Sequence, residues 1–127
     1  MARHWEVIWT FNTANFQIEY AVSDDDDLDM SWDEDGSVTD GLNRGLYVAF
    51  VARMRVIYKD TDTVLGQDYL GQCIYESATG FIDRPGTAGY FRDMVHEACR
   101  EARSCYARLA TMPKLRKCLG QWVKATP

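Results

Sequence analysis

Long hydrophobic runs are missing from this sequence. No apolar stretch approaches the ~20 residues that a membrane-spanning helix needs. The first residues, Met1 to Glu6, also lack the apolar core of about 7–15 residues that marks a secretory signal peptide. We therefore expect no membrane association, no export by the usual route, and a cytoplasmic location.

Cysteine is sparse, and its spacing fits none of the common cysteine motifs. The four cysteines are Cys73, Cys99, Cys105 and Cys118, and no two of them form a CxxC pair. This pattern gives no support to a zinc ribbon or to a thioredoxin-like redox site. In a protein that is not exported, reduced thiols in or near the core are the expected state.

Catalytic and cofactor motifs are also missing. The segment from His96 to Cys99 starts like the HExxH zinc motif, but Arg100 stands where the second histidine belongs. A zinc site would need two further ligands, so we interpret His96 as a surface residue. No phosphate-binding glycine loop, nucleophile elbow or oxyanion hole can be identified. The sequence predicts no catalytic residue, no metal site, no cofactor and no enzymatic activity.

The chain does have the composition of an ordinary globular protein. Of its 127 residues, 46% are hydrophobic and 26% are charged. A chain of this length buries roughly two-thirds of the surface that its unfolded form exposes, so it needs neither a metal nor a disulfide to fold. We expect residues 1–127 to form a single domain.

Charge is distributed very unevenly along the chain. The net charge is −5, but residues 1–40 contain eleven acids against Arg3 alone, whereas residues 41–127 contain eight acids against thirteen lysines and arginines. Nine of the acids fall within the seventeen residues from Asp24 to Asp40. Because unpaired charges are not buried, we expect residues 24–44 to form an acidic loop or edge-strand insert.

Alternation of apolar and polar residues predicts an N-terminal hairpin. Trp5, Val7, Trp9 and Phe11 alternate with more polar neighbours, which places these four side chains on one face of a strand. Alternation resumes from Phe16 to Ser23 after a short polar turn, so the two strands are expected to pair in antiparallel fashion.

The same pattern predicts further strands downstream. Residues 46–58 have one apolar face, while the other face turns polar at Arg53 and Arg55. Residues 64–75 fit either a fourth strand or a loop with one helical turn, and residues 77–87 are expected to be a loop.

Helical periodicity dominates the C-terminal part. Residues 88–110 have an apolar stripe at helical spacing, with Thr87 as the expected N-cap. After a break near Pro113, a second amphipathic helix is expected; its inward residues are Leu115, Cys118, Leu119, Trp122 and Val123. Strands first and helices last predict an α+β fold, in which two C-terminal helices pack on one face of an antiparallel sheet of three to four strands.

The acidic insert is the strongest candidate for a functional surface. Duplex DNA presents about one negative charge per 1.7 Å of its axis, and closely spaced carboxylates approach that density. Such a segment attracts the basic groove of a nucleic-acid-binding protein, and Trp32 would supply the apolar anchor of a hot spot. The residues predicted to bind the partner are Asp24, Asp25, Asp26, Asp27, Asp29, Trp32, Asp33, Glu34 and Asp35.

In size, charge and clustered aspartates, the chain resembles the small acidic inhibitors carried by phages and mobile elements, such as anti-CRISPR or anti-restriction proteins. The resemblance covers residues 24–40. It implies a non-enzymatic protein that binds the basic groove of a host nucleic-acid-processing protein or complex and blocks access of nucleic acid.

Other functions fit the same residues. An immunity- or antitoxin-like protein that occludes a toxin would also be acidic. A self-associating structural protein would pair its acidic segment with the basic helix of a second copy. A calcium loop is disfavoured, because Leu42 stands where the bidentate glutamate belongs. Direct nucleic-acid binding is not expected at a net charge of −5.

Overall fold

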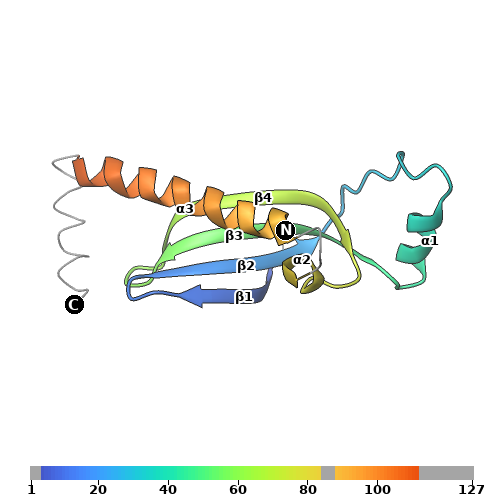
Figure 1. Ribbon diagram of the computed structural model, residues 1–127, viewed down its shortest axis with the longest axis horizontal. Coiled ribbons are helices and arrows are strands. Elements are labelled where there is room, and N and C mark those ends of the chain that lie inside the picture. Colours follow the sequence, from blue (N-terminus) through green and yellow to red (C-terminus); the bar gives the residue numbers. More distant parts are fainter. Residues whose placement is uncertain (1–3, 84–87, 112–127) are drawn as a thin grey trace.

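The fold is α+β, as the sequence predicts. The computed structural model describes residues 4–83 and 88–111, in which four antiparallel strands form one sheet of order β1-β2-β3-β4. The strands are β1 (Glu6–Asn12), β2 (Phe16–Asp24), β3 (Val48–Tyr58) and β4 (Thr63–Tyr75). The helices are α1 (Ser37–Asn43), α2 (Gly80–Asp83) and α3 (Ala88–Thr111), and α3 runs along one face of the sheet (Figure 1).

Two turns lie side by side at one end of the sheet. In the β1–β2 turn, the Phe16 amide donates to Thr13 Oγ1 at 3.1 Å, and the Thr13 amide donates to the Phe16 carbonyl oxygen at 2.8 Å. The β3–β4 turn contains Asp62 at a φ of 56°, a conformation that aspartate tolerates better than most residues. The Lys59 amide donates to the Asn15 carbonyl oxygen at 2.9 Å and joins the two turns.

Strand β1 contains a bulge that corrects the predicted faces. Val7 pairs with Ala21 but Trp9 pairs with Tyr20, so Ile8 is an extra residue in the ladder. An inserted residue reverses the side on which the following side chains lie. Trp5 therefore contacts the face away from α3, whereas Trp9 packs edge-on against Phe91 of α3 at 5.0 Å. The prediction that both tryptophans share one face is wrong.

The second hairpin resolves the ambiguity in residues 64–75. This segment is strand β4, which pairs with β3 along its length and contains two register shifts. Strand β3 begins at Val48, and Leu46 lies outside it with 55% of its surface exposed. Side chains of β3 alternate as predicted, because Met54 is fully buried beneath α3 while Arg53 lies on the opposite face.

Helix α3 approaches the sheet most closely at Gly66. A methyl group added to Gly66 would lie 2.6 Å from the Ala102 amide nitrogen and would also overlap the Ala98 carbonyl oxygen. Ala98 and Ala102 are themselves buried. Three small residues thus let the helix backbone rest directly on β4.

An aromatic cluster fills the core at the N-terminal end of α3. Phe81 is fully buried and contacts Tyr20, Phe50, Tyr75 and Phe91 at ring-centroid distances of 5.2–6.4 Å. Phe81 belongs to the short helix α2, in a segment that was expected to be a loop. Its burial is set by the strands that surround it, which local sequence does not reveal.

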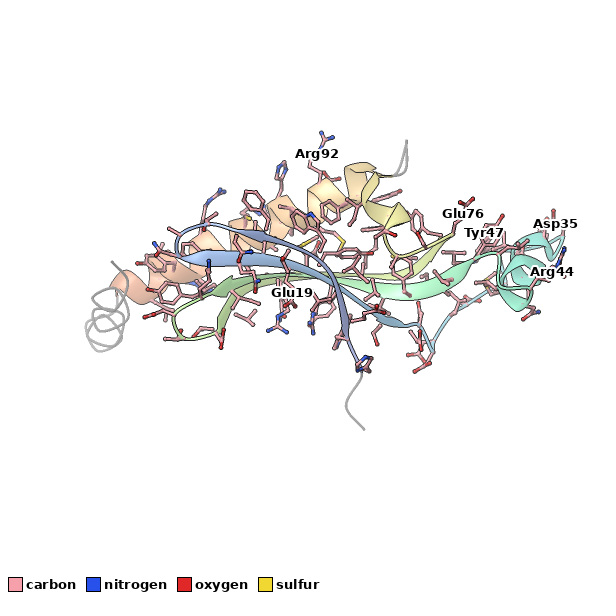
Figure 2. All side chains as sticks on the ribbon, turned by 90° about the horizontal axis from the view of Figure 1, so that it is seen from below. Glu19, Asp35, Arg44, Tyr47, Glu76 and Arg92 are labelled. Carbon is pink, nitrogen blue, oxygen red and sulfur yellow. The ribbon has the colours of Figure 1, made fainter. Side chains whose placement is uncertain are left out.

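On the face away from α3, a charged pair lies under an aromatic side chain. Arg53 Nη2 donates to Glu19 Oε1 at 3.1 Å, and both side chains are mostly buried. The Trp5 ring covers the guanidinium at 4.3 Å and contacts Tyr69. Figure 2 shows Glu19 on this face, opposite α3. Fully buried Ala21 lies between Val7 of β1 and Arg53 of β3 on this face.

The second amphipathic helix predicted for the C-terminal residues, including Cys118, and the expected N-cap Thr87 lie outside the described residues.

Candidate interaction surface: the acidic arm

The acidic insert forms an arm at one end of the sheet. We define the acidic arm as residues 25–47, which connect β2 to β3. The arm projects beyond the sheet and has α1 near its tip (Figure 1). It contains turns and the helix α1 but no strand, so the alternation of Leu28, Met30 and Trp32 does not produce the edge strand considered above.

The root of the arm is attached to the sheet. Asp24 is the last residue of β2 and pairs with Phe50 of β3. Asp25 Oδ2 accepts a hydrogen bond from the Gln72 amide at 2.8 Å, and its Oδ1 accepts one from the Asp27 amide at 3.2 Å. Gln72 has a φ of 54°, so Asp25 stabilises an irregular residue of β4. Asp25 is therefore a structural residue as well as a charge.

Asp29 and Asp35 each close a short turn. Asp29 Oδ1 accepts a hydrogen bond from the Ser31 amide at 3.0 Å, and Asp35 Oδ1 accepts one from the Ser37 amide at 2.9 Å. Hydrogen bonds from these two serines lower the pKa of both carboxyl groups. Both charges are held in place and persist at mildly acidic pH.

Asp33 caps the N-terminal end of helix α1, which begins at Ser37. Its Oδ2 accepts hydrogen bonds from the Thr39 amide and hydroxyl, both at 2.8 Å, at the end of the helix where backbone N–H groups lack partners. The N-cap residue itself is Gly36, at a φ of 71° and without a side-chain cap. Asp33 replaces it in that role, and negative charge is favourable at this end of a helix.

The tip of the arm packs on itself. The Tyr47 ring lies directly against Gly41, where a methyl group would overlap it, and the Leu46 amide donates to the Gly41 carbonyl oxygen at 2.8 Å. Arg44, the only basic residue of the arm, is labelled near Asp35 in Figure 2, and its Nη1 lies 3.4 Å from Asp40 Oδ2. This exposed pair contributes little stability.

The remaining predicted residues are exposed and unconstrained. Asp26, Asp27 and Glu34 are exposed, and the structure gives their carboxylates no hydrogen-bond partner among the described residues. Trp32 is 53% exposed in the middle of these charges. The structure thus separates the nine predicted residues into carboxylates that hold the arm together and groups that are free to meet another molecule.

An acidic cleft continues the arm onto the sheet. It has a volume of about 770 Å³ and lies between the ends of the strands at the root of the arm. Its acidic lining residues are Glu6, Asp24, Asp26 and Glu76. The negative surface therefore extends from the arm to the end of the sheet.

The other candidate groups show no assembled site. His96 is exposed on α3, as expected. Burial raises the pKa of the Cys73 thiol to about 11, so little of it is a reactive thiolate at neutral pH. In the part of the chain that the structure describes, no three metal-ligating side chains lie together. Within residues 4–83 and 88–111, no helix is both long and apolar enough to cross a bilayer.

Comparison with protein-family models finds no match, and comparisons with curated proteins and with solved structures find none either.

Proposed function

We propose that this protein is a non-enzymatic inhibitor of the phage or mobile-element type, anti-CRISPR-like or anti-restriction-like. In this proposal its acidic arm occupies the basic groove of a nucleic-acid-processing protein in the cytoplasm. One observation carries the proposal: eight of the nine acids between Asp24 and Asp40 lie on the arm, which projects beyond the sheet and exposes Trp32.

The order of the arm supports a role in mimicking phosphates. Asp29, Asp33 and Asp35 are fixed by hydrogen bonds from nearby backbone amides. Charges that are already held in place lose less conformational entropy when they dock. A groove that accepts closely spaced phosphates therefore has a ready counterpart in these carboxylates.

Trp32 supports a protein partner rather than a purely electrostatic one. Its side chain is half exposed, although burial of an indole ring is strongly favourable. Tryptophan is among the residues most enriched in interface hot spots. We expect Trp32 to enter an apolar pocket beside the basic groove, while Asp26, Asp27 and Glu34 meet the surrounding lysines and arginines.

The proposal is tested with two matched variants of the full chain. The arm variant combines Asp26→Asn, Asp27→Asn and Glu34→Gln, because these carboxylates hold nothing in the fold. The control variant combines Asp60→Asn, Asp62→Asn and Asp93→Asn, which removes the same charge from exposed positions elsewhere. Partners are captured from host lysate, identified by mass spectrometry, and assayed for nucleic-acid binding with each protein added.

The expected result is a nucleic-acid-processing complex whose nucleic-acid binding is blocked by the unmodified protein and by the control. The arm variant, and separately Trp32→Ala, should weaken binding by on the order of tenfold or more. Equal binding by the arm variant rejects the proposal. Capture of a small basic toxin would replace it with an immunity function, and capture of this chain alone would replace it with self-assembly.

A further inference from the structure

The described residues form an apolar groove at the end of the sheet where the β1–β2 turn lies, opposite the acidic arm (Figure 1). Its volume is about 770 Å³, within the range of about 300–1,000 Å³ that is typical of small-molecule sites. The floor consists of two cross-strand pairs of β2 and β3, Phe16 with Tyr58 and Ile18 with Val56. The second half of α3 forms the wall.

The groove is elongated because α3 covers only part of the sheet. The helix backbone rests on β4 at Gly66, and the helix also packs on β3. On the β2 side of the helix, Ile18 is only partly buried, and its partner on β1, Phe11, is 53% exposed. The helix wall from Cys99 to Ala107 is about 12 Å long, at about 1.5 Å per residue. A linear apolar chain that lay along this wall would bury apolar surface of the groove, which is favourable.

A polar atom without a partner lies in the groove lining. Asn15 of the β1–β2 turn lines the groove, and its Oδ1 is buried with no hydrogen-bond partner among the described residues. The backbone oxygen of the same residue accepts a hydrogen bond from the Lys59 amide, so only the side chain lacks a donor. A buried acceptor without a partner is unfavourable, and a ligand that donates a hydrogen bond to it removes that cost.

One cation lies at the rim. Arg103 is the only charged residue among the described residues that line the groove, and it is exposed. Within the described part of the chain, no carboxylate forms an ion pair with it. The guanidinium group binds carboxylates through two parallel hydrogen bonds. The charge of the groove therefore favours an anionic ligand.

We propose that this groove binds an amphiphile of the N-acyl amino acid class, in which an acyl chain, an amide N–H and a carboxylate occur together. The acyl chain lies along α3 on Phe16 and Ile18, the amide N–H donates to Asn15 Oδ1, and the carboxylate accepts hydrogen bonds from Arg103. This inference is independent of the function proposed for the arm.

Two ligands that differ at one atom test the hydrogen bond to Asn15. The full chain is titrated by calorimetry with N-lauroylglycine and with N-lauroylsarcosine, both below the critical micelle concentration. The sarcosine compound carries a methyl group in place of the amide proton, so it should bind on the order of tenfold more weakly. The Asn15→Ala variant should bind the two ligands equally. Equal binding of both by the unmodified protein, or binding of neither, would overturn the proposal.

Matched variants of α3 test the charge and the position of the site. Arg103→Gln should weaken N-lauroylglycine binding by on the order of tenfold, whereas Arg92→Gln, at an exposed position on the first half of α3 (labelled in Figure 2), should not. Ala107→Trp, which places an indole ring at the groove, should block binding, and Ser104→Trp, exposed outside the groove lining, should not.

Circular dichroism confirms that each variant is folded. An equal loss of affinity in Arg103→Gln and Arg92→Gln would overturn the proposal in favour of general attraction between an anionic surfactant and the basic residues of the helix. Unchanged affinity in Arg103→Gln or in Ala107→Trp would overturn it by placing the ligand elsewhere.

Discussion

At the scale of single residues, the contact between α3 and the sheet depends on Gly66. Replacement by alanine places a methyl group against helix backbone, which cannot turn aside as a side chain can. We expect Gly66→Ala to lower the free energy of unfolding by about 1–3 kcal/mol. Gly71→Ala is the matched control, because its added methyl group has no atom within 4 Å. Urea denaturation of both variants measures the difference, and equal midpoints would contradict the inferred contact.

Single residues also mark the limits of sequence reasoning. No glycine or proline marks the bulge at Ile8 in the sequence. The alternation of β1 could therefore be predicted, but not that the side chains after Ile8 lie on the other face of the sheet. The acidic segment could be located, but not which carboxylates are structural. Asp25 binds the amide of Gln72, and nothing local in the sequence indicates that partner.

At the scale of elements, the periodicity of apolar residues predicted the long strands and the long helix correctly. Strands with strict alternation and the long helix with its apolar stripe were predicted within a few residues. The two short helices were missed, for physical reasons. Helix α1 depends on a carboxylate from Asp33, outside its own span, and α2 is held by Phe81, whose aromatic contacts come from β2, β3, β4 and α3.

The interface between β4 and α3 contains an unfavourable charge. Desolvation raises the pKa of Asp68, and the neighbouring Glu97 and Glu101 of α3 raise it further. The folded state therefore binds the Asp68 proton more tightly than the unfolded state does. As the pH rises through the ordinary aspartate pKa of about 3.9 and above it, ionisation of Asp68 lowers the free energy of unfolding.

We therefore expect Asp68→Asn to stabilise the protein at neutral pH. The gain should vanish about one unit below the ordinary aspartate pKa, where Asp68 is protonated in both states. Urea midpoints at the two pH values measure the effect. Asp93→Asn, at an exposed position of α3, is the control, and a gain for Asp68→Asn that stays constant with pH would show that the carboxylate charge is not its cause.

At the scale of the whole molecule, the two candidate surfaces lie at opposite ends. The acidic arm extends from one end of the sheet, where β2 ends and β3 begins (Figure 1). An apolar groove lies at the other end and is lined by the β1–β2 turn and the second half of α3. No residue of the arm belongs to the buried core cluster that the structure describes. Changes to one end should therefore leave the other intact, which allows the two proposals to be tested separately.

The arm also has a consequence for how fast and how stably the chain folds. Every strand pairs with the strand next to it in the sequence. Most strand pairs therefore join residues that are close along the chain, which favours rapid folding. The exception is the β2–β3 pair, which must first close the loop of residues 25–47.

Replacing residues 27–46 with a Gly/Ser loop about a quarter as long should raise the free energy of unfolding by about 1 kcal/mol and speed refolding, as stopped-flow kinetics in urea would measure. A shortened chain that folds more slowly or less stably would show that the arm helps to build the sheet. The expected result would show that the sheet folds without the arm. It would also show that the arm lowers the stability of the fold, because closing a longer loop costs more conformational entropy.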